Sequence, residues 1–186
     1  MIYIISAVMA ALVIVADQLT KSFIASNFEL GAQSVPFIKN IIDITYVENE
    51  GGAWGFMQDN TWLLVALTII IMIVCVAMLI KDGFKHKLLF FGIVLVLSGG
   101  VGNLIDRIFK GRVVDFIQFD FWRTFPVFNV ADIAVTLGAA LLLLYFVIDI
   151  IKDYKNKKKA NDDMLNANEE KNGNSEESNI AEQKAD

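Results

Sequence analysis

The chain has 186 residues, of which 55% are hydrophobic, with a mean hydropathy of +0.52 and a formal net charge of −5 at pH 7. A soluble domain of this length would not carry so many long apolar runs, so the composition excludes an ordinary soluble globular protein. The only cysteine, Cys75, excludes an intrachain disulfide. The only histidine, His86, has no second histidine or cysteine cluster to complete a zinc site.

Four apolar runs follow one another along the chain, at residues 2–24, 62–80, 88–105 and 131–148. Each is close to the ~20 residues that a helix needs to cross the hydrocarbon core of a membrane. Uninterrupted runs of this kind predict helices, because only helices or closed barrels satisfy their backbone groups in lipid. A cleaved signal peptide fits the first run poorly, since no Lys or Arg precedes it and no good cleavage signal follows. We therefore predict an all-α membrane protein with four transmembrane helices.

Basic segments set the expected orientation. Residues 81–87 join the second and third runs, residues 152–159 follow the fourth, and both segments are rich in lysine. Basic segments favour the cytoplasmic side, so we expect both termini in the cytoplasm and residues 26–61 and 109–130 outside. A stop-transfer anchor at residues 152–159 would agree with the same orientation. The predicted location is the cytoplasmic membrane, with several membrane crossings.

Two domains are expected. Residues 1–152 form the transmembrane domain, and residues 153–186 form a tail that is first basic and then acidic. From residue 160 onward there are no aromatic residues, and Asn, Glu, Asp and Ser dominate, which predicts a disordered cytoplasmic tail. Because this tail carries much of the net charge, the charge says little about a substrate.

The two expected outer segments differ in character. Residues 35–47 are β-branched and aromatic and are interrupted by Pro36 and Asn40, which predicts short strands in a small outward-facing, β-containing cap. Within the second segment, residues 116–128 carry six aromatic side chains, either as an interfacial anchor or in contact with substrate: Phe116, Phe119, Phe121, Trp122, Phe125 and Phe128.

The unusual polar residues converge on one membrane face. With the expected orientation, all of them fall in or beside the outer segments, and scattered structural polar groups would have no reason to gather in this way. Ionisable residues at membrane depth are costly and usually mark a functional site. The set consists of Asp17, Lys21, Asn49, Asn103, Asp106, Arg107, Asp115, Asn129 and Asp132.

Three shorter patterns have both a structural and a functional interpretation. Asp17 and Lys21 share a helix face at i, i+4 and can pair, either as a structural element or as support for a site. Residues 99–102 contain three glycines, which provide a smooth helix face for another helix or a substrate. In the same stretch Asp106 can orient Arg107 toward a carbonyl, a carboxylate or a lipid headgroup, or Arg107 can simply extend to the interface.

The most informative pair is Asp115 and Asp132, which lie 17 residues apart beside the fourth apolar run. Two carboxylates held close together can share one proton. The ionised one can then deprotonate a water while the protonated one polarises a carbonyl, with no metal and no cofactor. The alternative is that both are helix-end caps, with Asp132 as the N-cap of the fourth helix.

Five ordered motifs resemble the lipoprotein signal peptidase family, also called signal peptidase II or prolipoprotein signal peptidase. The resemblance covers about residues 2–152 and lies in Asp17-Gln-Leu-Thr-Lys21, Asn49-Glu-Gly-Gly-Ala-Trp-Gly55, Gly102-Asn-Leu-Ile-Asp-Arg107, Val113-Val-Asp-Phe-Ile117 and Phe128-Asn-Val-Ala-Asp132. Small departures occur at Gly52, where Ala is more usual, and at Ile133, where Ser is common; neither removes a catalytic group.

The resemblance implies an aspartic endopeptidase that removes the signal peptide from diacylglyceryl-modified bacterial prolipoproteins, on the amino side of the lipidated Cys. It implies Asp115 and Asp132 as the catalytic pair and no metal. It further implies that substrate is supported by Asn49, Asn103, Arg107, Asn129, Asp17 and Lys21. The expected partners are this substrate and membrane lipids, not nucleic acid, and we expect a monomer.

Two other functions are compatible with parts of the sequence. A proton-coupled transporter would use the acids as a relay, but a relay should distribute them through the depth of the membrane. A noncatalytic protein that binds lipid headgroups through Arg107 and Arg112 would leave the two aspartates without a role. Both are weaker than the peptidase.

Overall fold

A computed structural model describes residues 2–52 and 60–183. The helices are α1 (Ile2–Asn27), α2 (Thr61–Met78), α3 (Lys87–Lys110) and α4 (Val130–Gln183), with a short π-helix, η2 (Leu79–Gly83), after α2. Four helical stretches are long and apolar enough to cross a membrane. The prediction of four transmembrane helices is confirmed, and α3 extends five residues beyond the predicted end at residue 105.

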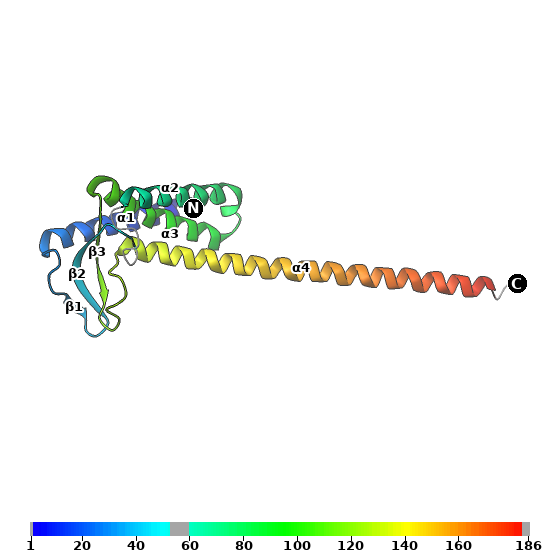
Figure 1. The fold of residues 1–186 in the computed structure, drawn as a ribbon. Coiled ribbons are helices and arrows are strands. Elements are labelled where there is room, and N and C mark those ends of the chain that lie inside the picture. Colours follow the sequence, from blue (N-terminus) through cyan, green and yellow to red (C-terminus); the bar gives the residue numbers. More distant parts are fainter. Residues whose placement is uncertain (1, 53–59, 184–186) are drawn as a thin grey trace. The chain divides into compact units, whose positions relative to one another are not determined.

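Helix α3 is the central element of the helical part. Half of its apolar stretch is buried within the protein, against 17% for α1 and 11% for α2, so the other helices leave most of their apolar side chains for lipid. Figure 1 shows α1 and α2 running beside α3, with their ends near one another. Side chains on α3 therefore mostly contact neighbouring helices, whereas side chains on α2 mostly face outward.

Glycines allow α3 to approach its neighbours closely. A Cβ added at Gly99 would collide with the backbone carbonyl of Ala131 on α4, and one at Gly102 would lie 2.6 Å from Asp17 Oδ2 on α1. Of the two interpretations of the glycine-rich face, the structure supports contact with other helices. This close packing brings α1, α3 and α4 together where their polar residues lie.

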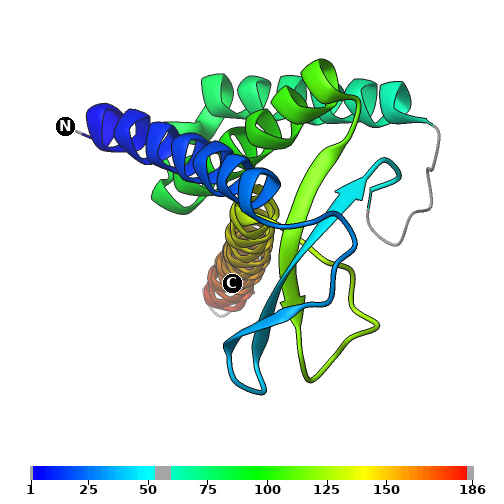
Figure 2. The same cartoon turned by 90° about the vertical axis from the view of Figure 1, so that its left-hand side faces the viewer.

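The three strands form one antiparallel sheet in the order β1 (Val35–Ile38), β2 (Ile42–Asn49) and β3 (Val113–Phe119). It lies at the end of the helices where α1 and α3 finish and where α2 and α4 start (Figures 1 and 2). The strands expected in residues 35–47 are confirmed. Strand β3 was not predicted.

Strand β3 is buried on both faces. Val114 and Phe116 pack with Ile24, near the end of α1, while Val113 and Asp115 face the opposite way and line a pocket. This is the period-2 alternation of a strand, but here the second face contains a carboxylate. In the ladder Asp115 lies opposite Val47 of β2, and a bulge between Ile44 and Val47 shifts the register just before that pair.

The chain divides into two units, Met1–Leu143 and Leu144–Asp186. The first contains the sheet, α1 to α3 and the beginning of α4; the second contains the remainder of α4. The backbone of residues 160–183 is helical, which differs from the disordered tail that the composition predicts. No proline interrupts this stretch, and the expected boundary at residue 152 and the disordered tail remain predictions.

Candidate active site

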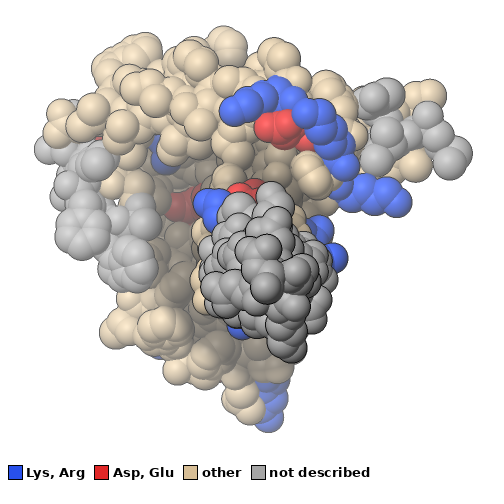
Figure 3. Space-filling model, turned by 90° about the vertical axis from the view of Figure 1, so that its right-hand side faces the viewer, with Lys and Arg blue, Asp and Glu red and all other residues tan. Residues whose placement is uncertain are grey.

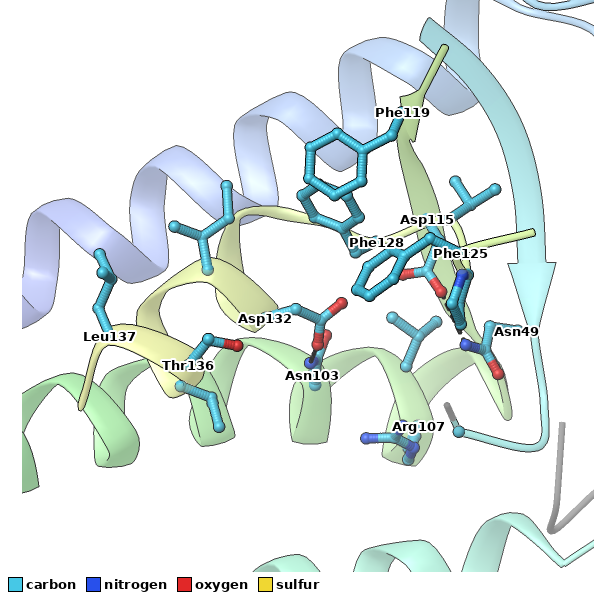
Figure 4. A pocket seen from close by; sticks show the side chains of 16 residues that line it. Asn49, Asn103, Arg107, Asp115, Phe119, Phe125, Phe128, Asp132, Thr136 and Leu137 are labelled. Carbon is cyan, nitrogen blue, oxygen red and sulfur yellow. Dashed lines mark hydrogen bonds between the residues drawn. The ribbon is translucent and has the colours of Figure 1, made fainter. Parts of the chain in front are cut away.

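A pocket of about 450 Å³ lies where β3, α3 and the first turns of α4 meet. At one end it is polar, and Figure 4 shows Asp115 from β3 and Asp132 from α4 beside the same space, with Asn103 and Arg107 of α3 close by. The other walls are apolar, formed by aromatic residues after β3 and by α4 side chains. The pocket therefore combines two carboxylates with a hydrophobic surface.

Asp115 is almost entirely buried, with 2% of its surface exposed, and is held by two amides. Asn49 Nδ2 donates to Oδ2 at 2.7 Å, and Asn129 Nδ2 donates to Oδ1 at 2.6 Å. Burial and the negative charge of Asp132 raise the pKa of Asp115 to about 7, although the hydrogen bonds from Asn49 and Asn129 oppose the rise. Asp115 thus exchanges its proton near neutral pH.

Asp132 belongs to the capping structure of α4. Its Oδ2 accepts a hydrogen bond from the Asn129 backbone N–H at 3.1 Å, while the Asp132 N–H donates to Asn129 Oδ1 at 2.9 Å. This reciprocal pair is a capping box with Asn129 as the N-cap. The alternative in which Asp132 is the N-cap is wrong by three positions, because the helix begins at Val130. Its other oxygen, Oδ1, accepts from Asn103 Nδ2 at 2.7 Å.

Two asparagines connect the carboxylates. Asn129 contacts Asp115 through its amide and Asp132 through its backbone, and its Nδ2 is also 3.1 Å from Asn103 Oδ1. Asn103 in turn donates to Asp132. Asp115 and Asp132 are therefore members of one hydrogen-bonded network, so a change at one carboxylate is transmitted to the surroundings of the other.

A fully buried ion-pair cluster contacts this network on the side away from the pocket. Lys21 Nζ lies 2.9 Å from Asp17 Oδ2 and 3.0 Å from Asp106 Oδ2, and it donates to Asn103 Oδ1 at 2.8 Å. The other oxygen of Asp17 accepts the Ala131 backbone N–H at 2.9 Å. The expected pairing of Asp17 with Lys21 is confirmed, and it joins α1 to both α3 and the start of α4.

Replacing Lys21 with Met should destabilise the protein by about 3–5 kcal/mol, because Asp17 and Asp106 would remain buried without their cation. Thermal unfolding in detergent measures the change. The control is Lys85→Met, which breaks an ion pair with Asp82 in which the lysine side chain is 67% exposed. That variant should stay within about 0.5 kcal/mol of the parent, and equal losses from the two variants would contradict the buried-cluster account.

Arg107 lines the pocket and keeps a donor available. Its Nε is buried and has no hydrogen-bond partner among the residues described. The interpretation in which Asp106 orients Arg107 is not found in the structure. Asp106 pairs instead with Lys21 and with Lys110, and the Lys110 Nζ lies 2.8 Å from Asp106 Oδ1. A buried donor without a partner is costly, which makes Arg107 a candidate contact for a carbonyl or carboxylate of a substrate.

The aromatic residues of β3 and of the connection to α4 separate into three groups. Phe119, Phe125 and Phe128 line the pocket, with ring centroids 5.1 to 5.9 Å apart. Phe121 and Trp122 are exposed, as an interfacial anchor would be, and Phe116 is in the core. The two interpretations of this segment therefore fit different residues, and both remain predictions.

The predicted site residues do not all occupy equivalent positions. Asn49, Asn103, Arg107, Asp115 and Asp132 line the pocket, whereas Asn129, Asp17 and Lys21 lie behind it and reach it through hydrogen bonds. Their catalytic and supporting roles remain predictions. Of the glycine-rich loop, Gly52 lines the pocket with a φ of +71°, and residues 53–55 fall outside the described part of the chain.

Sequence reasoning missed Thr136, which also lines the pocket. Its spacing of four residues from Asp132 places both on one helix face, and this signal was available. Within the described part of the chain, no group of three His, Cys, Asp or Glu side chains is placed to hold a metal ion. The expectation of metal-free chemistry remains a prediction.

Fold and site together define a membrane protein with several crossings and a carboxylate-lined pocket at one end of its helices. A family model described as signal peptidase (SPase) II matches residues 9–148, well over half of the chain. The chain therefore belongs to the signal peptidase II family, a family of peptidases.

Individual relatives agree with this assignment. A lipoprotein signal peptidase of Brevibacillus brevis is 41% identical over 140 residues, which cover 75% of this chain and 93% of the relative. A bacterial membrane enzyme structure determined by the in meso method at 2.3 Å resolution has a TM-score of 0.72 and 35% identity, covering 78% of this chain and 88% of that one. A second, at 1.9 Å, has a TM-score of 0.70 and 36% identity, covering 76% and 91%.

Proposed function

We propose that the protein is an aspartic endopeptidase that removes the signal peptide from diacylglyceryl-modified prolipoproteins, cleaving on the amino side of the lipidated Cys. The observation that carries the proposal is that Asp115 and Asp132 line one pocket and share one hydrogen-bonded network. Family membership supports the class of substrate, and the carboxylate pair supports the chemistry.

In the proposed reaction, one carboxylate is ionised and the other holds the proton. The ionised group takes a proton from a water molecule, whose oxygen attacks the scissile carbonyl, while the protonated group polarises that carbonyl and gives its proton to the oxygen that becomes negative. When the tetrahedral intermediate collapses, the C–N bond breaks and the amine leaves with a proton from the pair. Arg107 supplies a further donor beside the same space.

The shape of the pocket suits a substrate that is partly polar and partly lipid. Its polar end would hold the peptide bond, and the ring faces of Phe119, Phe125 and Phe128 would contact apolar parts of the substrate. The exposed apolar faces of the helices indicate that substrate approaches sideways through the membrane. Partial exclusion of water also favours the shared proton.

We infer an orientation in which the sheet and the pocket face outward. The turn between α2 and α3 lies at the opposite end of these helices and contains Lys81, Lys85 and Lys87. Figure 3 views the molecule from that side and shows Lys and Arg side chains, with Asp or Glu among them, on a surface of mostly other residues. Basic turns favour the cytoplasm, so both termini would be cytoplasmic.

A proton relay for transport is the second candidate, and the distribution of acids counts against it. Asp17, Asp106, Asp115 and Asp132 all belong to the contacts around one end of the helices. A relay needs groups through the depth of the membrane. The same gathering of acids is what a hydrolytic site requires.

The proposal is tested with purified protein in detergent and two forms of one prolipoprotein, with and without the diacylglyceryl group. We expect the lipidated form to be cut once, directly before the modified Cys, as read by mass spectrometry of both products. The unlipidated form should be cut far more slowly, and a metal chelator should have no effect. Equal cleavage of both forms would refute the proposed substrate class, and strong inhibition by the chelator would refute the metal-free mechanism.

A further inference from the structure

A charged cluster outside the pocket joins two parts of the protein that are distant in sequence. Arg123 lies in the connection between β3 and α4, and its Nη2 is 2.8 Å from Asp43 Oδ2 on β2 and 2.5 Å from Asp120 Oδ1. Its Nη1 donates to Ser34 Oγ at 3.3 Å, and Ser34 donates to Asp43 Oδ2 at 3.1 Å. We call these four residues the Arg123 cluster.

Asp43 makes the cluster more than a surface ion pair. Asp43 is only 2% exposed, and its Oδ1 has no hydrogen-bond partner among the residues described. Its negative charge is therefore stabilised through the contacts to Oδ2. Arg123 is the cation in contact with that oxygen, although the arginine side chain itself is 55% exposed. Removing one partner of a buried carboxylate is much more disruptive than removing an exposed pair.

The residues on either side of Arg123 form one wall of the pocket. Phe119 precedes the connection, Phe125 and Phe128 lie within it, and all three rings contact one another and line the pocket. Around the cluster the backbone is tied to the sheet by the Asp120 N–H, which donates to Ile41 O at 3.1 Å. The ion pair between Arg123 and Asp43 ties the same connection to β2 through side chains.

We propose that Arg123 is a positioning residue that anchors the connection between β3 and α4 to β2 and thereby holds the aromatic wall of the pocket in place. The wall, and not the carboxylates, depends on it: neither Arg123 nor Asp43 lines the pocket, and the network around Asp115 and Asp132 is built from α1, α3, Asn49 and Asn129. Arg123 thus acts on the binding of the apolar part of the substrate, a statement that rests on the proposed function.

Kinetics test the binding effect. In Arg123→Gln the KM for a lipidated prolipoprotein should rise roughly tenfold, the scale of one charge-assisted hydrogen bond, while kcat changes by less than about twofold. Arg123→Lys, which keeps the charge but not the forked geometry, should give an intermediate KM. Asp43→Asn should also raise KM, and the double variant should be no worse than the more affected single variant, because both changes break the same contact. A fall in kcat at constant KM, or fully additive effects, would overturn the proposal.

Hydrogen exchange tests the positioning effect without any need for activity. Backbone amides of residues 120–128 should exchange faster in Arg123→Gln than in the parent, while those of α3 should be unchanged. Lys39→Gln, at an exposed lysine in the turn between β1 and β2, is the matched control and should alter neither exchange nor KM. Unchanged exchange at 120–128, or faster exchange throughout α3, would overturn the proposal. If the parent protein fails to cleave any lipidated substrate, the proposed function is refuted. The hydrogen-exchange result at residues 120–128 still decides whether Arg123 positions the connection.

Discussion

The variants Asp115→Asn and Asp132→Asn should each cleave substrate roughly 10³-fold more slowly than the parent, or slower still. The amide of Asn can neither take a proton from water nor give one to the leaving amine. Both variants should remain folded in the membrane. An Asn at 115 loses about one hydrogen bond, since Asn49 and Asn129 both direct Nδ2 donors at that side chain. The expected cost is about 1 kcal/mol. The rate is measured in single-turnover reactions with excess enzyme, and folding by thermal unfolding in detergent.

The control for this prediction is Asp82→Asn. Asp82, in η2, forms an exposed pair with Lys85 in the turn before α3, at the end of these helices opposite to the pocket. The Asp82→Asn substitution also converts one carboxylate to an amide, but away from the pocket, so cleavage at the parent rate is expected. Cleavage at the parent rate by either Asp115→Asn or Asp132→Asn would remove that residue from the catalytic pair.

The second large effect is on the pH dependence. The pKa of Asp115 is raised to about 7 by burial and by the charge of Asp132, so the group is protonated below that pH and ionised above it. Once both carboxylates are ionised, no shared proton remains to polarise the carbonyl. We therefore expect kcat/KM to fall about tenfold per pH unit as the pH rises through about 7. This falling limb of the plot of kcat/KM against pH reports the ionisation of the carboxylate pair as a whole.

The position of that limb should move in a defined direction in Asn49→Leu. The Asn49 amide donates to Asp115 Oδ2 and favours the ionised form, so its removal raises the pKa of Asp115 and shifts the limb to higher pH. A shift of up to about one unit corresponds to about 1.4 kcal/mol. Asn27→Ala, which removes an exposed amide bonded to the Phe23 carbonyl, should leave the limb in place. A shift to lower pH in Asn49→Leu would show that the ionisation of Asp115 does not contribute to this fall in kcat/KM.

The elements that could be predicted are those whose signal is local. Long apolar runs predicted the helices, and the i, i+4 spacing predicted the Asp17–Lys21 pair. Strand β3 was missed because it does not alternate between polar and apolar residues: Val114 and Phe116 face the core, and Val113 on the other face is also buried. A strand covered on both sides lacks the pattern that identifies a half-exposed one.

The contacts that were mispredicted depend on the tertiary fold. One of the two interpretations of Arg107 had Asp106 orienting it, but Lys21, 85 residues earlier in the chain, pairs with that carboxylate together with Lys110. The capping box of α4 did have a local signal, since Asn129 and Asp132 have the spacing of an N-cap residue and an acidic residue three positions later. Asp132 is therefore both the acidic residue of the capping box and a carboxylate of the pocket, although the N-cap itself is Asn129.

The buried cluster around Lys21 explains how α1, α3 and the start of α4 are held together behind the pocket. Asp17 caps the start of α4 through the Ala131 N–H, and Lys21 holds the Asn103 amide with its oxygen toward the ammonium. Because Lys21 can only donate, the Asn103 Nδ2 must point away and reaches Asp132. The sheet contributes Asp115, Asn49 and, through Arg123, the aromatic wall.

The central claim is that Asp115 and Asp132 act as one unit, and the double variant Asp115→Asn/Asp132→Asn tests it most directly. Single-turnover cleavage of a lipidated prolipoprotein is measured for the parent, both single variants and the double variant. If the two carboxylates share one catalytic proton, the double variant should be no slower than the slower single variant, because the first substitution already removes the function of the pair. Losses that multiply, so that the double variant is slower by the product of the two single effects, would mean that the two side chains work independently and would contradict the shared-proton mechanism.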